Sequence, residues 1–116
     1  KLSKLFLNEG TYLGRRYIKK NLVNIFTSKI KNPVNSDRAL GWDTPSKKGK
    51  STAGDYFSDQ TYGHLGFTGT SLWIDPENDI IVIFLTNRVH PTRNKDGINS
   101  VRRELHTSIV KELLGE

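Results

Sequence analysis

The stretch that decides the fold is residues 61–87, which read TYGHLGFTGTSLWIDPENDIIVIFLTN. Within it, GFTGTSLWI predicts one strand, residues 75–79 predict a turn, and IIVIFLTN predicts a second strand. The six residues Ile80–Leu85 are all apolar, which is typical of a strand buried on both faces. We therefore expect Ile80–Leu85 to be a central strand, paired on one side with Phe67–Ile74.

The entry to the first of these strands is rich in small residues: Gly66, Thr68, Gly69, Thr70 and Ser71. A strand that only builds a core favours larger β-branched and aromatic residues. One interpretation is that a ligand lies against the glycines, with backbone N–H groups holding a carbonyl oxygen and His64 acting as an acid, base or cation. The alternative is a tight turn with His64 at the surface, and spacing alone leaves both open.

The residues before this stretch predict two helices and a hairpin. Leu2–Leu7 predicts helical turns that stop at residues 8–10, and GTYLGRRYI predicts a hairpin around Gly14. KKNLVNIFTSKI predicts a helix that Asn32-Pro33 ends, with an apolar face of Leu22, Val23, Ile25, Phe26 and Ile30. Residues 31–63 predict loop, with a strand of three or four residues at ALGWD. We expect part of so long a loop to lie over a site.

The C-terminal residues predict an amphipathic helix. It begins near Asn99 or Ser100, either of which is a good N-cap, and Gly115 ends it. Its expected core-facing residues repeat with helical period and are Val101, Leu105, Ile109, Val110, Leu113 and Leu114. The sequence therefore predicts an α+β fold in which helices flank an antiparallel β-sheet.

Composition limits the kinds of site that the chain can carry. Its 116 residues include no cysteine, which excludes disulfides, thiolate catalysis and cysteine-based zinc sites. The three histidines are dispersed without an i,i+4 pair, so their spacing predicts no metal site. The net charge is +6, but the densest basic cluster, Lys47-Lys48-Gly49-Lys50, is interpreted as a solvated loop rather than a phosphate-binding patch. We expect no nucleic-acid partner, and no apolar run approaches the ~18 residues of a transmembrane helix.

The run GHLGFTGTSLWIDPENDIIVIFLTNRVHPTR resembles the C-terminal third of the serine β-lactamase and penicillin-binding-protein-like hydrolases, in particular the class C β-lactamase-like esterases and D-aminopeptidases. In that family a Lys-Thr-Gly or His-Thr-Gly triplet lies on the strand beside the active site. A second Thr-Gly, a hairpin, a strand ending near Thr-Asn-Arg and a C-terminal helix follow, and ALGWD is similar to the strand before the triplet. The resemblance implies a serine hydrolase that acts through an acyl-enzyme on an ester, amide or peptide-like substrate, without a cofactor.

The resemblance also implies roles for individual residues. His64 takes the basic position of the triplet, and Gly66 takes the position of its glycine. The backbone N–H of Phe67 corresponds to one of the family's two oxyanion-hole donors. Thr68 and Gly69 match the second Thr-Gly, and with Gly66 they are expected to contact substrate. Leu65 stands where the family has a threonine for substrate carboxylates. It therefore disfavours β-lactams and peptide carboxylates and favours esters and amides that lack this anchor.

The family nucleophile, the serine of a Ser-x-x-Lys motif at a helix start, has no convincing counterpart. Ser-x-x-Lys occurs at Ser28–Lys31 and Ser108–Lys111, but 9 Ser and 11 Lys in 116 residues give about one such match by chance. Ser28 is expected near a helix end and Ser108 within the last helix, and both are in the wrong order relative to His64. Neither Tyr-x-Asn nor Ser-x-Asn, which would complete the family site, occurs.

The chain contains no methionine and opens within a helical pattern. We expect residues 1–116 to be the C-terminal fragment of one β-lactamase-like domain, with the nucleophile in an upstream part of the same protein. In the family that part also supplies the second neighbour of the Ile80–Leu85 strand. An unpaired edge, or its pairing with another molecule or in a homo-oligomer, is therefore expected. Family members are often exported, which implies the periplasm or cell envelope.

Two function classes remain open from the sequence: a serine hydrolase, or a non-catalytic β-lactamase-like scaffold or basic interaction module. The remaining candidate residues have plain structural interpretations. His90 is expected in a surface turn rather than at a site rim, and His106 on the solvated side of the last helix. Trp42 and Trp73 could line a pocket, but core packing is the preferred interpretation.

Overall fold

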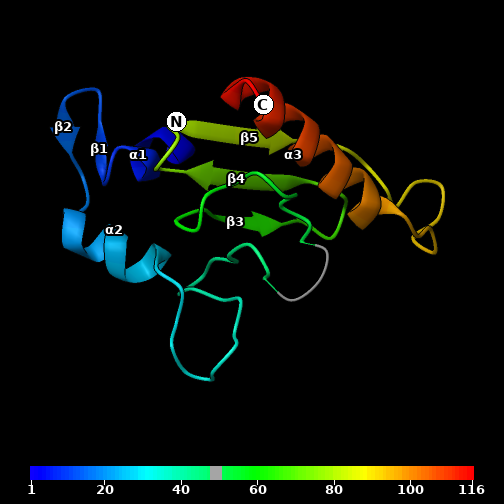
Figure 1. Cartoon of the computed structure of the whole chain (residues 1–116), viewed down its shortest axis with the longest axis horizontal. Coiled ribbons are helices and arrows are strands. Elements are labelled where there is room, and N and C mark those ends of the chain that lie inside the picture. The colour runs from blue at the N-terminus through cyan, green and yellow to red at the C-terminus, as the bar shows by residue number, and fades with distance from the viewer. Residues whose placement is uncertain (48–50) are drawn as a thin grey trace.

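The computed structural model describes residues 1–47 and 51–116. Its elements are α1 (Leu2–Leu7), β1 (Thr11–Tyr12), β2 (Arg15–Arg16), α2 (Lys20–Thr27), β3 (Tyr62–Leu65), β4 (Ser71–Asp75), β5 (Ile80–Phe84) and α3 (Ile98–Leu114). β3, β4 and β5 form an antiparallel sheet in that order, with α3 lying across it (Figure 1). This is the α+β class that the sequence predicts. Among the described helices, none combines the length and apolar character needed to cross a bilayer.

The central strand of this sheet is β4, not the apolar strand β5. β5 pairs with β4, as expected, and has no second partner strand among the described residues. The expected unpaired edge is therefore confirmed for this part of the chain. Burial on both faces is wrong, because Ile83 is 56% exposed and Leu85, just beyond the strand, is 75% exposed. These apolar side chains are exposed because no described residue forms a covering layer over this end of the sheet.

The predicted strand over residues 66–74 is two elements rather than one. β3 ends at Leu65, residues 66–70 form the hairpin turn, and β4 begins at Ser71. The turn is closed by the N–H of Gly66, which donates to the carbonyl of Thr70 at 2.8 Å. The small residues of this stretch thus serve a hairpin, and the alternative interpretation of a tight turn is correct for the backbone.

The two faces of the sheet are covered differently. Directly opposed residues of antiparallel strands share a face, so Gly63, Trp73 and Val82 lie on one face, and His64, Leu72 and Ile83 on the other. α3 covers the first face, where Trp73 is buried as expected of a core residue. Within the described part of the chain, the second face is covered only at the end next to α1, where an edge-on aromatic stack joins Phe6, Trp42 and Tyr62.

The helix α3 presents a largely polar face to the sheet. Its buried residues are Arg102, His106 and Val110, four residues apart and therefore on one side of the helix. The expected location of His106 in solvent is wrong: its side chain is fully buried, and its Nε2 lies 3.1 Å from the hydroxyl oxygen of Ser71. The nitrogen Nδ1 lies 2.7 Å from the carbonyl of Thr52. The helix is rotated so that these polar groups meet partners in the sheet and loop.

The ends of α3 only partly follow the predicted caps. Gly115 is the C-cap, with a φ of 74°, as expected. The predicted N-caps are wrong, because the helix begins at Ile98 after Gly97, and Asn99 and Ser100 lie within the first turn. Gly97 has a φ of 98°, a left-handed conformation that glycine adopts without steric cost, so a backbone turn rather than a capping side chain starts the helix.

The first N-terminal elements follow the prediction, but α2 follows it only in part. α1 ends before residues 8–10, and β1 and β2 form the hairpin around Gly14. α2 is shorter than expected, because it ends at Thr27 with Ser28 as its C-cap. Of its predicted apolar face only Val23 is buried, while the side chains of Leu22, Ile25 and Phe26 are exposed.

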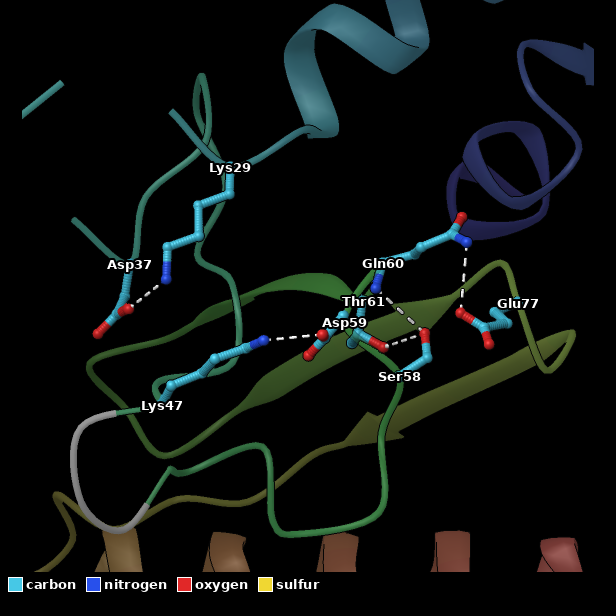
Figure 2. Close-up of polar contacts among 8 residues, drawn as sticks. All are labelled: Lys29, Asp37, Lys47, Ser58, Asp59, Gln60, Thr61 and Glu77. Carbon is cyan, nitrogen blue, oxygen red and sulfur yellow. Dashed lines mark hydrogen bonds and ion pairs between the residues drawn. The ribbon is translucent and has the colours of Figure 1, made fainter. Parts of the chain in front are cut away.

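The loop between α2 and β3 crosses the sheet edge and anchors on both faces. ALGWD is not a strand of several residues: Asp43 alone makes two backbone hydrogen bonds to Gly63 of β3. Further along, the hydroxyl of Ser58 donates to Asp75 at 2.6 Å. The side-chain amide of Gln60 contacts Glu77 (Figure 2). The predicted basic cluster includes Lys47, which pairs with Asp59; residues 48–50 lie outside the described part of the chain, so the cluster stays a prediction.

We predict that protonation of His106 destabilises the fold. Burial, the largest cause, and the nearby Arg102 lower the pKa of His106, although its bond to Thr52 opposes them. Above the unfolded-state pKa of about 6.5 the ring is neutral in both states. Below it, the unfolded chain takes up a proton that the folded chain resists. The free energy of unfolding should therefore fall below pH 6.5 with a slope approaching about 1.4 kcal/mol per pH unit.

Urea unfolding of wild type and His106→Gln between pH 7.5 and 5 measures this effect. The variant should be less stable than wild type at pH 7.5, but its free energy of unfolding should depend much less on pH below 6.5. The matched control is His90→Gln, at an exposed histidine, which should keep the wild-type slope. A His106→Gln variant that retains the full slope would show that another group is responsible.

We predict that Asp75→Asn destabilises the fold by about 2 to 3 kcal/mol. The buried carboxylate accepts hydrogen bonds from the N–H and hydroxyl of Ser58, the N–H of Glu77, and the backbone and side-chain N–H groups of Asn78. Burial raises the pKa of Asp75, but the bonds from Ser58 and Asn78 outweigh it and leave the pKa below its ordinary value. The stabilisation is therefore present above the unfolded-state pKa and is lost as pH falls through the depressed one.

Urea unfolding at pH 7 tests this substitution against Asp59→Asn. Asp59 is exposed and pairs with Lys47 at the surface (Figure 2), so its loss should cost less than about 1 kcal/mol. Equal destabilisation by the two substitutions would contradict the special role of the buried carboxylate.

Candidate active site

His64 lies at the open end of β3, with an exposed side chain. Its Nδ1 lies 2.9 Å from the carbonyl oxygen of Leu65, which directs a protonated Nδ1 to that acceptor and leaves Nε2 toward solvent. The ring borders a shallow hollow of about 270 Å³ on the sheet face opposite α3, lined by His64, Leu65, Gly66, Thr70, Ser71, Leu72, Ile83 and Leu85. No residue of the described part of the 31–61 loop lines it, so the expectation that this loop lies over the site finds no support there.

The glycines at the hairpin make room for neighbouring groups of the chain itself. A Cβ on Gly66 would overlap the hydroxyl of Thr70. Gly69 has a φ of 114°, and a Cβ there would lie 2.8 Å from the methyl group of Thr86. These contacts explain both glycines without a ligand, and they keep the turn tight. The side chain of Thr68 is exposed, and its carbonyl accepts the N–H of Arg88 at 2.8 Å.

Phe67 sits at the tip of the turn, with its side chain 63% exposed. The guanidinium carbon of Arg88 lies 4.5 Å from the ring centroid, and that of Arg93 lies 5.8 Å from it. Arg88 also donates from Nε to the Phe67 carbonyl at 2.7 Å. The backbone N–H of Phe67 donates to none of the described residues, so it is available to a hydrogen-bond acceptor from outside this part of the chain.

Arg102 of α3 holds both ends of the hairpin turn from the opposite face. Its Nη2 donates to the carbonyl of Gly66 at 2.8 Å and to that of Thr70 at 2.7 Å. The side chain is almost fully buried, and its Nη1 reaches Asn99 at 3.2 Å. Burial and the charge of Arg88 lower the pKa of Arg102, but a guanidinium stays charged in proteins. A fixed positive charge therefore lies directly behind the turn.

The sequence did not identify Arg102 as a site residue. The buried face of a helix is predicted from the spacing of its apolar residues, and this places an arginine in solvent. One signal was available in retrospect: Arg102, His106 and Val110 share a face at a spacing of four. A basic residue in line with a core residue requires acceptors within the fold.

The other predicted candidates stay apart from this region. Ser28 is the C-cap of α2, where its hydroxyl donates to the carbonyl of Asn24 at 2.6 Å, and Ser108 is exposed on α3. Neither position is a helix start, as expected. His90 is exposed in the loop before α3, also as expected. Burial, with a smaller contribution from Glu9, raises the pKa of Tyr62 to about 12, so its hydroxyl stays protonated near neutral pH.

Another hollow, also about 270 Å³ in volume, lies within the long loop that follows α2. Lys29 and Lys47 border it, but each is engaged with a carboxylate, at 2.7 Å to Asp37 and 2.7 Å to Asp59 (Figure 2). The buried hydroxyl of Thr44 has no hydrogen-bond partner among the described residues. Among the described residues that line this hollow, the two lysines pair with carboxylates rather than with a nucleophile, so the β3–β4 hairpin remains the stronger candidate site.

The chain is similar to known proteins over most of its length. The family model described as Beta-lactamase matches residues 2–107. A "Putative D-alanyl-D-alanine carboxypeptidase" of Salmonella gallinarum is 36% identical over 90 residues, and one of Salmonella typhi is equally so. In both cases the match covers 77% of this chain and 20% of the relative, so the chain spans about a fifth of the length of these proteins. By the family match, the chain belongs to the beta-lactamase family.

Proposed function

We propose that this chain forms one wall of the active site of a serine hydrolase that works through an acyl-enzyme. The N–H of Phe67 serves as an oxyanion-hole donor, and His64 donates a hydrogen bond or exchanges a proton at the reacting group. Gly66, Thr68 and Gly69 shape the turn along which the acyl group lies. The nucleophilic serine comes from residues of the whole protein outside this chain.

The observation that carries the proposal is the pairing of an unused backbone donor with an exposed histidine on one hairpin. The N–H of Phe67 has no acceptor among the described residues, and His64 borders an open hollow three residues earlier. Backbone donors held by a tight turn need little reorganisation when negative charge develops on a substrate oxygen. Hydrogen bonds and close packing hold this turn, which suits that task.

The substrate class follows from Leu65. A leucine cannot donate a hydrogen bond to a carboxylate, so this position favours esters or amides without a carboxylate next to the scissile bond. The relatives carry a name that refers to D-alanyl-D-alanine. A threonine at the position of Leu65 would bind the free carboxylate of that dipeptide. We therefore propose that the whole protein turns over neutral esters and amides better than carboxylate-bearing analogues.

In the whole protein, His64→Ala is expected to lower the turnover of a neutral ester by ~10²-fold, the usual effect of removing one positioned acid–base group. The exposed side chain of His64 has one hydrogen bond among the described residues, to the carbonyl of its neighbour Leu65, so the fold should be unaffected. Steady-state ester hydrolysis and circular dichroism measure the two effects. His90→Ala, at the exposed histidine outside the hollow, is the control and should retain turnover. Wild-type turnover in His64→Ala would remove this residue from the mechanism.

The 116-residue chain by itself is expected to hydrolyse neither esters, amides nor β-lactams at an enzyme-like rate. It holds one donor and a histidine, which polarise a carbonyl but form no acyl-enzyme without a nucleophile. The test incubates the chain and the whole protein with a fluorophosphonate probe and locates the label by mass spectrometry. Labelling of a serine outside residues 1–116 supports the proposal.

Stoichiometric labelling of Ser28 or Ser108 that is lost on substitution by alanine would identify a nucleophile within this chain. Absence of labelling and of turnover in the whole protein would instead favour a non-catalytic scaffold.

A further inference from the structure

The buried guanidinium of Arg102 bridges the two ends of the hairpin that carries the candidate oxyanion donor. One nitrogen, Nη2, lies 2.8 Å from the Gly66 oxygen and 2.7 Å from the Thr70 oxygen. The Gly66 oxygen also accepts the N–H of Gly69 at 3.0 Å. Since Arg102 is only 4% exposed, water cannot readily replace these bonds. The carbonyl of Gly66 is thus fixed from the α3 side of the sheet.

This contact determines the direction of the Phe67 N–H through the planarity of the peptide. The Gly66–Phe67 bond is trans, and in a planar trans peptide the C=O and N–H groups point in opposite directions. With the Gly66 carbonyl directed at the guanidinium of Arg102 and at the N–H of Gly69, the N–H of Phe67 is directed away from both groups.

The charge of Arg102 also strengthens this N–H as a donor. Hydrogen bonding to a charged group polarises a carbonyl, and the polarisation extends across the peptide to its N–H. The effect is large where the local dielectric is low, as around a buried side chain. The same contact therefore both orients and polarises the peptide.

From these contacts we infer that Arg102 is a positioning residue for the oxyanion hole, acting through the Gly66 carbonyl on the Phe67 N–H. This inference rests on the proposed function for its kinetic consequence, but its geometric content does not depend on that function. Arg102 acts without contacting substrate in this scheme, because its guanidinium is buried and bonded to the carbonyls of the hairpin turn.

The test uses Arg102→Lys and Arg102→Gln in the whole protein. Lysine keeps the charge but lacks the planar fork, and glutamine keeps one donor group without charge. The matched control is Arg103→Gln, which removes a neighbouring arginine of the same helix that pairs with Asp55 rather than with the hairpin. Circular dichroism and thermal unfolding confirm that each variant is folded.

The first readout is kinetic. Loss of a complete oxyanion donor costs about 10²- to 10³-fold in kcat, so a donor that is only misaligned should cost about 10-fold or more in Arg102→Gln. Arg102→Lys should fall between Arg102→Gln and wild type. KM for a neutral ester should change little, because the interaction forms mainly in the transition state. Arg103→Gln should retain kcat.

The second readout is the amide of Phe67 itself. Gly66-Phe67 is the only Gly-Phe pair in this sequence, so labelling with 13C-carbonyl glycine and 15N-phenylalanine selects its amide signal, which Phe67→Leu assigns in the whole protein. The amide proton should shift upfield in both Arg102 variants and stay unchanged in Arg103→Gln.

The outcomes separate the inference from the proposed function. An inactive wild-type protein in which the amide still shifts removes the hydrolase proposal and leaves the positioning role of Arg102 supported. The inference alone is overturned if the wild-type protein is active and both Arg102 variants keep the wild-type kcat and the wild-type chemical shift of the Phe67 amide. A raised KM at constant kcat, or loss of the fold in both variants, likewise overturns it in favour of a binding or purely structural role.

Discussion

The structure depends on the burial of a charged and polar helix face against the sheet. Arg102 and His106 of α3 are both removed from water, and burial of such groups is costly unless their hydrogen bonds are made within the fold. The partners are carbonyl groups of the hairpin and the loop, together with the hydroxyl of Ser71. The helix can meet these partners only at one position and rotation, so the placement of α3 and the shape of the hairpin are fixed together.

This coupling divides the sheet into a closed side and an open side. On the closed side, Trp73 and Val82 pack beneath α3, and the loop before β3 adds Phe57 and the Thr52 carbonyl. On the open side, His64, Leu72 and Ile83 border the hollow. A rigid backbone supported from behind and exposed in front is what a site built from backbone donors requires. The site proposed here thus owes its geometry to residues that face away from it.

Exposed apolar residues mark where this chain covers itself incompletely. They include Ile83 and Leu85 at the open side of β5, and Leu22, Ile25 and Phe26 on α2. The outer edge of β5 also has no partner strand among the described residues. Unpaired edges and apolar faces are surfaces on which further protein can pack. They agree with the proposal that the active site is completed by residues outside this chain.

The sequence by itself determined the elements whose signals are local. Leu2–Leu7, the hairpin around Gly14, the pairing of the two apolar strands and the final helix all follow from periodicity and turn residues over a few positions. The family motif placed His64, Gly66 and Phe67 together, because adjacent residues of one hairpin remain adjacent in any fold. What only the tertiary structure decided is what these elements meet. A helical pattern ranks Val101 and Leu113 above Arg102 and His106 for the core, yet the two polar residues are buried and the two apolar ones are exposed. The reason is that burial of an arginine or histidine depends on acceptors from residues 52, 66, 70 and 71, which lie more than thirty positions away, and no local pattern contains them.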